Sequence, residues 1–227
     1  MPTKLTERFA CYVRVTMLSL LALVFITAVA AAGCGGKDCD SCTTPTGILQ
    51  GSYTIRNSLD ADWISAITSI TGDLNVDFSS LTSLDLPALT SVEGCLYIHD
   101  NYALTSLSLP ALTSVGGFLA LTGNDALTSL DLTALTSVGG ELRISNNAAL
   151  TSLSGLAALT SVGGELNIYD NAALTSLDLS ALTTVGGTLE ILGNAALCNS
   201  LAIALRDQLI AAGWNGGSAT QGNDSTC

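Results

Sequence analysis

A phrase of about 23 residues recurs through most of this chain, and this repeat limits the possible folds more than any other feature. The pentapeptides Ala-Leu-Thr-Ser-Leu and Ala-Leu-Thr-Ser-Val alternate along the sequence, and one glycine keeps a fixed place in each unit. These glycines are Gly94, Gly117, Gly140, Gly164 and Gly187. Repeats of this length indicate an array of similar structural units, each packed on its two neighbours.

Within one unit the apolar residues alternate with a period of two, which is typical of strands rather than helices. Leu96-x-Ile98 alternates first and Leu107-x-Leu109 alternates later in the same unit. The chain breakers between these segments are Asp100-Asn101, Pro110 and Gly116-Gly117. We therefore predict three short strands per unit. The expected fold is an all-β repeat, a right-handed parallel β-solenoid over residues 51–197, with equivalent strands stacked about 4.8 Å apart.

The repeat also predicts which residues are buried in the core and which lie at the corners between strands. One coil is expected to bury Leu96, Ile98, Leu104, Leu107, Leu109, Leu112 and Val115. A column of asparagines is expected at one corner, at Asn101, Asn124, Asn147, Asn171 and Asn194. Such asparagines can bond backbone groups that the strands leave unpaired. The column is therefore interpreted as structural.

Two places depart from the repeat. One step is a residue longer than the others and contains Gly155, where we expect a β-bulge. Near the start, residues 61–70 contain Trp63, Ile64 and Ile67 and could form a helix that caps the first coil. A cap is expected there because the end of a solenoid exposes unpaired strand edges.

After Cys198 the repeat stops, and residues 198–227 are predicted to cap the last coil. A helix is expected over 200–212, with Asn199 or Ser200 as its N-cap. Cys198 and Cys227 flank this helix, and in an oxidising compartment we expect them to form a disulfide.

Residues 1–33 have the pattern of an export signal, with a positive start, an apolar run and small residues at the end. The run Ala31-Ala32-Gly33-Cys34 resembles a bacterial lipobox. That resemblance implies cleavage before Cys34, acylation of Cys34 and, since Gly35 follows, an outer-membrane lipoprotein of the cell envelope. Two or more acyl chains would hold the protein stably on the membrane. Residues 34–50 are expected to form a flexible tether.

Two other interpretations of the N-terminus stay open. The uncharged stretch from Val15 to Gly36 is long enough to remain as an uncleaved membrane anchor. An ordinary cleaved signal without lipid is the third option. All three place the rest of the chain outside the cytoplasm.

Three more cysteines need an account. Cys39 and Cys42 have a spacing found in zinc sites, but no second pair accompanies them. A small disulfide between these two residues is the favoured interpretation. Cys95 is then expected to be free or to pair with Cys39 or Cys42, and the sequence leaves these pairings open.

The whole unit G-x-L-x-I-x-x-N-x-A-L-T-S-L-x-L-P-A-L-T-S-V-G resembles the receptor L-domain repeat, the leucine-rich β-helix of insulin-receptor and epidermal-growth-factor-receptor ectodomains. The resemblance covers about residues 51 to 227. It implies an extracellular binding module and gives no ligand residues. Ordinary leucine-rich repeats share part of the pattern and are the second candidate for the fold.

Composition argues against several functions. The formal charge of −12 opposes nucleic-acid binding, which needs clustered Lys and Arg. His99 is the one histidine of the chain, so no Ser-His-Asp constellation is expected and we predict no enzyme. Solenoid polysaccharide-active enzymes use grouped carboxylates, but Asp73, Asp77 and Glu93 fit solvated surface acids better. We also expect no metal site and no cofactor.

The outward side of the G-x-L-x-I strands is the best candidate for a binding surface. Its expected exposed residues are Tyr97, His99, Phe118, Arg143 and Tyr169. Aromatic side chains and arginine are enriched in interfaces. The favoured hypothesis is a non-catalytic, lipid-anchored surface module that binds an unidentified protein or glycan through this sheet. The alternatives are a structural envelope protein and, less favoured, a polysaccharide-active enzyme.

Overall fold

The computed structural model describes residues 45–227, which form one compact unit. The predicted signal at 1–33, the lipidation site Cys34, and Cys39 and Cys42 lie outside the described residues. Most of the predicted tether lies outside them as well.

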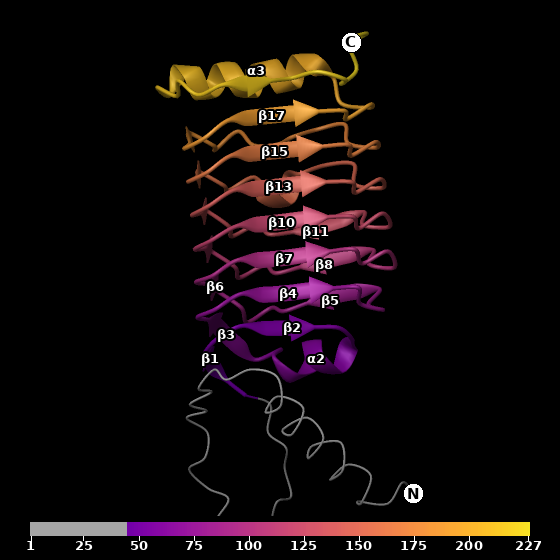
Figure 1. The fold of residues 1–227 in the computed structure, drawn as a ribbon, viewed down its shortest axis with the longest axis vertical. Helices are drawn as coiled ribbons and strands as arrows, with labels where there is room; N and C mark the ends of the chain where they lie inside the picture. The colour runs from indigo at the N-terminus through magenta and orange to yellow at the C-terminus, as the bar shows by residue number, and fades with distance from the viewer. Residues whose placement is uncertain (1–44) are drawn as a thin grey trace, which may run out of the picture. The chain divides into compact units, whose positions relative to one another are not determined.

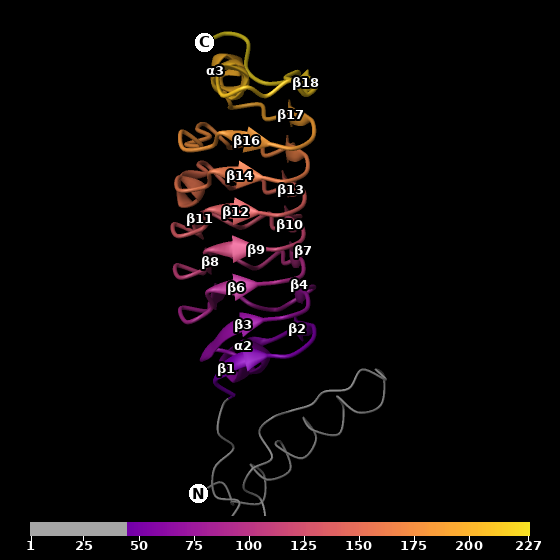
Figure 2. The ribbon, with the colours of Figure 1, turned by 90° about the vertical axis from the view of Figure 1, so that its left-hand side faces the viewer.

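The described chain is a parallel β-solenoid with about 23 residues per turn, as the repeat predicts (Figure 1). All named strand pairs are parallel, and each turn adds strands to sheets on different sides of the coil (Figure 2). Sheet A contains β1 (Gly47–Leu49), β3 (Ile67–Ile70), β6 (Ser91–Val92), β9 (Ser114–Val115), β12 (Ser137–Val138), β14 (Ser161–Val162) and β16 (Thr184–Val185). Sheet B contains β2 (Tyr53–Ile55), β4 (Leu74–Asp77), β7 (Leu96–His99), β10 (Leu119–Thr122), β13 (Leu142–Ser145), β15 (Leu166–Tyr169), β17 (Leu189–Leu192) and β18 (Ser218–Ala219).

Equivalent residues of successive coils stack in register inside the solenoid. Leu96 pairs with Leu119, and Leu119 pairs with Leu142. All seven residues predicted to face inward in that coil are at most 1% exposed, which confirms the predicted core. Because each leucine lies between its counterparts, one coil gains its apolar burial mainly from its neighbours.

The third side of the coil is less regular than predicted. Sheet C has only three strands in the described part of the chain, namely β5 (Ser83–Asp85), β8 (Ser106–Ser108) and β11 (Ser129–Asp131). At Gly155 the chain forms a 3₁₀ turn, η1 (Ser154–Leu156), instead of the expected bulge. A Cβ on Gly155 would lie 2.1 Å from the Leu130 carbonyl oxygen, so glycine is required there. The turn absorbs the extra residue and keeps Leu156 buried.

The N-terminal end differs from two expectations. Strand β1 lies inside the segment predicted as a tether, because Leu49 packs on the core while β1 pairs with β3. The first helix of residues 45–227, α2 (Ser58–Trp63), begins earlier than predicted, and Asn57 caps it by accepting from two backbone N–H groups. The second half of the predicted helix is strand β3. Its β-branched Ile67 and Ile70 are buried there and favour a strand.

The C-terminal cap is helix α3 (Asn199–Ala211), which covers the last coil (Figure 1). Its buried face consists of Ala202, Leu205 and Leu209, whereas Leu201 is exposed. Cys198 takes the N-cap position, but its side chain makes no capping hydrogen bond to the first turn of the helix. Neither Asn199 nor Ser200 is the N-cap, and the Asn199 side chain instead accepts a hydrogen bond from Asn223.

The predicted disulfide between Cys198 and Cys227 is present, with Cα atoms 5.7 Å apart. It ties the last residue of the chain to the start of α3. Among residues 45–227, no helix combines the length and apolar character needed to cross a bilayer.

One glycine of each Gly-Gly corner permits the coils to approach closely. A Cβ on Gly139 would lie 2.1 Å from the carbonyl oxygen of Gly116 in the preceding coil. The same contact recurs at Gly163 and Gly186. A side chain at these places would push neighbouring coils apart, so the glycine repeat is a requirement of stacking.

Candidate ligand-binding face

The outward residues of sheet B vary from coil to coil, whereas those of sheet A hardly vary. From β3 onward the outward column of sheet A reads Ser69, Ser91, Ser114, Ser137, Ser161 and Thr184, and the exposed Ile48 of β1 precedes it. The first outward column of sheet B reads Asn75, Tyr97, Ala120, Arg143, Asn167 and Glu190. The second reads Asp77, His99, Thr122, Ser145, Tyr169 and Leu192. Chemical variety is thus concentrated on one side of an otherwise uniform solenoid.

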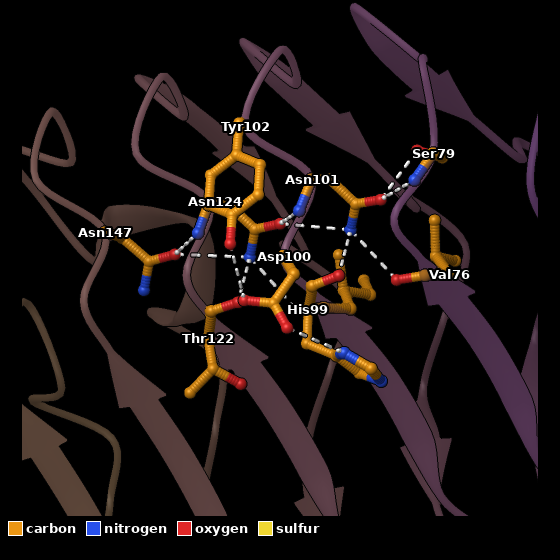
Figure 3. Close-up of polar contacts among 10 residues, drawn as sticks. Val76, Ser79, His99, Asp100, Asn101, Tyr102, Thr122, Asn124 and Asn147 are labelled. Carbon is orange, nitrogen blue, oxygen red and sulfur yellow. Dashed lines mark hydrogen bonds and ion pairs between the residues drawn. The ribbon is translucent and has the colours of Figure 1, made fainter.

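An asparagine ladder fixes the corner at which the sheet B strands end (Figure 3). The Asn101 side-chain amide donates to the Val76 and His99 carbonyls at 2.9 and 3.0 Å and to Asn124 Oδ1 at 3.1 Å. The five predicted asparagines are fully buried and repeat this arrangement. Ser79 and Asn223 extend the ladder at its two ends, which the sequence pattern did not indicate. Residues beside this corner are therefore held rigidly.

The residue just before each ladder position adopts a positive φ. In most coils this residue is Asp, Asn or Gly, which accept the left-handed conformation readily. The residues of this column are Phe78, Asp100, Gly123, Asn146, Asp170 and Gly193. Phe78 is the exception, with φ of 45° and a side chain that is 70% exposed.

Tyr97 and His99, two of the five predicted face residues, are neighbours on the outer side of β7. Tyr97 lies beside Cys95, and a side-chain hydrogen bond to Cys95, together with burial and the charge of Asp73, raises the pKa of Tyr97 to about 12. Cys95 is a free cysteine. Its backbone N–H donates to Asp73 at 2.7 Å, and its Sγ accepts from the Phe118 N–H at 3.3 Å.

His99 belongs to an aromatic and acidic cluster at the rigid corner. Its Nδ1 lies 3.6 Å from Asp100 Oδ2, and its ring meets the Phe78 ring edge-on with centroids 6.0 Å apart. Asp100 also accepts from the hydroxyl of Tyr102 at 3.4 Å (Figure 3). Next to His99 in register is Asp77, whose Oδ1 is buried and has no hydrogen-bond partner within residues 45–227.

The repeat pattern did not indicate Phe78, Asp77 and Tyr102 as members of this cluster. Phe78 and Tyr102 lie in the corner, where the alternation of a strand does not apply. The available signal was the mismatch at Phe78, because the equivalent residues of the following coils are Asp, Gly or Asn.

Arg143 and Tyr169 belong to a second cluster, on β13 and β15. The Arg143 Nε donates to Glu141 at 2.8 Å, and this bond raises the pKa of Arg143. Burial and a hydrogen bond to Glu190 raise the pKa of Tyr169. The buried Asn167 donates to Glu141 at 2.7 Å and leaves its Oδ1 without a partner in the described chain. Arg143 and Tyr169 are thus already bonded to carboxylates.

The predicted face therefore divides into two clusters, and Phe118 lies between them at 48% exposure. The His99 corner carries exposed rings, whereas the Arg143 cluster is largely bonded within itself. In the described part of the chain, no group of three or more His, Cys, Asp or Glu side chains could hold a metal ion.

Comparison with known families finds one match. The model of the Receptor L domain matches residues 113–209, which include β10, β13, β15, β17 and most of α3. Comparisons with curated proteins and with solved structures found no match. Receptor L domains are solenoid-like and bind ligands without catalysis. The C-terminal coils of this solenoid, with the first part of its cap, are therefore similar to a receptor L domain in both sequence and architecture.

Proposed function

We propose that this protein is a non-catalytic, lipid-anchored binding module of the cell surface that recognises a protein or glycan through the outer face of sheet B. The Receptor L domain match supports ligand binding as the general function. The lipid anchor, the location and the ligand class are the parts that experiments have to test.

The observation that carries the proposal is the contrast between sheets A and B. Stacking requires the buried leucines, the corner glycines and the asparagine ladder, and these recur in every regular coil. The outward serines of sheet A recur too, although they are not core residues. Among the sheets of residues 45–227, sheet B alone carries aromatic residues together with charged groups on its outward side, and such side chains dominate binding energies at interfaces.

A matched pair of substitutions tests which face binds. Ala120 on sheet B and Ser137 on sheet A both point outward and are half-buried at the centre of their sheets. We expect Ala120→Arg to abolish binding of the full chain on a glycan array or in a pull-down of surface proteins, and Ser137→Arg to leave it intact. Tyr97→Ala is expected to weaken the same signal. Equal effects of both arginines would contradict the proposal.

The structural alternative predicts a different outcome. If the coils serve only spacing and stability in the envelope, both arginine variants will complement a deletion strain equally well. Under our proposal Ala120→Arg fails to restore the function lost in that strain, although the variant protein is present at normal abundance.

The anchor is tested separately. Acylation needs the Cys34 thiol and the amine released by cleavage, so the mature protein extracted from membranes should have the mass of residues 34–227 plus acyl chains. We expect Cys34→Ser to abolish acylation, observed as loss of the added acyl mass. An unmodified mass that begins at residue 1 would indicate the uncleaved anchor instead.

A further inference from the structure

The His99 corner, defined here as Asp77, Phe78, His99, Asp100 and Tyr102, combines features that folding alone does not require. The Phe78 and Tyr102 side chains are 70% and 61% exposed. Their rings therefore contribute little to the core, whose leucines lie on the other side of the backbone.

Phe78 is also unfavourable for the fold. A bulky residue at positive φ is a genuine outlier, and such strain costs about 1–3 kcal/mol. The equivalent residues Asp100 and Asn146 show which side chains the corner accommodates easily. Because the exposed ring regains little by burial, its presence points to a contact made outside the folded chain.

The charges around these rings are mostly negative. Asp77 and Asp100 belong to the corner, and the charges of Asp100 and Asp125 raise the pKa of Tyr102. The buried Oδ1 of Asp77 has no donor among residues 45–227. Arg56 follows β2 and is the nearest cation along the sheet, at the register position beside Asp77.

We propose that the His99 corner binds the amino or guanidino group of a basic segment in a partner protein. This inference rests on the proposed function and specifies which part of the sheet B side is used and what it recognises. A cation is attracted to the faces of the exposed rings, while Asp100 accepts its N–H groups and the charge of the nearby Asp77 adds to the attraction.

Charge complementarity favours a basic partner over a neutral glycan. The other two arginines of the described chain, Arg143 and Arg206, are each bonded to an acid, Glu141 and Asp207. With a formal charge of −12, the chain also attracts cationic partners from a distance. A neutral sugar would gain nothing from this field.

His99 provides a direct reporter because it is the one histidine of the chain. The probe is the acetylated and amidated peptide Lys-Gly-Lys-Gly-Lys, titrated into the full chain, without a histidine tag, in detergent. We expect the imidazole C–H resonances of His99 to shift saturably, and binding to weaken several-fold as the salt concentration rises to 0.5 M (about a 4 Å screening length).

Two variants localise the site. Phe78→Asn introduces the residue type that Asn146 provides at the equivalent position of a later coil, so the variant is expected to fold. Asp77→Asn removes one negative charge from the corner. We expect each to weaken peptide binding about tenfold. Ile48→Ala, an exposed apolar residue of sheet A, serves as the matched control and should bind like the parent chain. Arg56→Ala should bind more tightly.

Any of three results would contradict this inference. Unshifted His99 resonances at millimolar peptide would exclude the corner as a cation site. The Ala120→Arg test would then decide separately whether sheet B binds any ligand. Equal responses to a glutamate peptide or to a neutral oligosaccharide would exclude recognition by charge. Binding that survives both Phe78→Asn and Asp77→Asn would place the site elsewhere.

Discussion

The side-chain amide of Asn124 donates a 2.9 Å hydrogen bond to the main-chain carbonyl of Ile98, which belongs to the preceding coil. The same bond links Asn147 to Leu121 and Asn171 to Ile144. Each asparagine thus satisfies backbone groups that the parallel strands leave unpaired where they end. The ladder explains why a polar residue recurs at a fully buried position.

Replacing one member of this ladder should strongly destabilise the solenoid. In Asn147→Ala the buried carbonyls of Leu121 and Ser145 and the backbone N–H of Asn124 lose their partner. We expect the free energy of unfolding to fall by about 3–5 kcal/mol, measured by urea denaturation. Asn146→Gly, at the exposed neighbour with positive φ, should change it by less than about 1 kcal/mol.

Phe78→Asn should have the opposite effect on stability. The substitution relieves the strained φ of 45° and removes a side chain that is mostly exposed to water. We therefore expect the free energy of unfolding to rise by about 1 kcal/mol. Asp170→Asn, at an equivalent place with φ of 52°, is the control and should be nearly neutral. A clear loss of stability in Phe78→Asn would mean that the ring is structural. Gain of stability with loss of peptide binding is the combination that the His99 corner predicts.

The tyrosines offer a test in alkaline solution. Because Cys95 holds the pKa of Tyr97 at about 12, this phenol stays protonated in the folded chain after an unfolded chain would have ionised near pH 10. Its contribution to stability is therefore complete below about pH 10 and declines between about pH 10 and 12. We expect Cys95→Ala to lower the pKa of Tyr97, observed as earlier phenolate absorbance. An unchanged titration in Cys95→Ala would refute the assigned cause, and Tyr97→Phe identifies the affected component.

The disulfide should matter most for the C-terminal cap. Cys198 and Cys227 are 29 residues apart, and closing such a loop contributes about 3–4 kcal/mol by the chain-entropy model. We expect Cys198→Ser with Cys227→Ser to increase hydrogen exchange in α3 and β18 while the asparagine ladder of the middle coils keeps its protection. Uniform loss of protection through all coils would show that the cap controls the whole fold.

The features that recur in every coil were predicted correctly from the sequence. The features found in a single coil were not. Leu96, Leu119 and Leu142 lie over one another as their spacing indicates, because a fixed period leaves one register for burying every leucine. The predicted tether includes Gly47–Leu49, which form a strand, and the helix predicted over 61–70 lies at Ser58–Trp63. Both predictions differ from the structure because neither segment has a second copy in the sequence for comparison. Gly155 was recognised as an irregularity, but the type of turn depends on the carbonyl of Leu130 in another coil.

The candidate face was predictable in part for the same reason. Alternation identified the outward residues Tyr97 and His99 on β7, because a strand has only two sides. It could not show that Arg143 and Tyr169 are already bonded to Glu141 and Glu190, since these contacts depend on side-chain conformations across coils. Nor could it place Phe78 beside His99, because that contact is made by a corner residue with an unusual backbone conformation.

Photocrosslinking in the native envelope tests the central claim without knowledge of the ligand. A photoreactive amino acid is placed at Ala120 on sheet B or at Ser137 on sheet A of the full chain, in cells that produce it. We expect a discrete crosslinked product from position 120 and none from position 137. Crosslinks of equal yield from both positions, or from position 137 alone, would contradict the assignment of sheet B as the binding face.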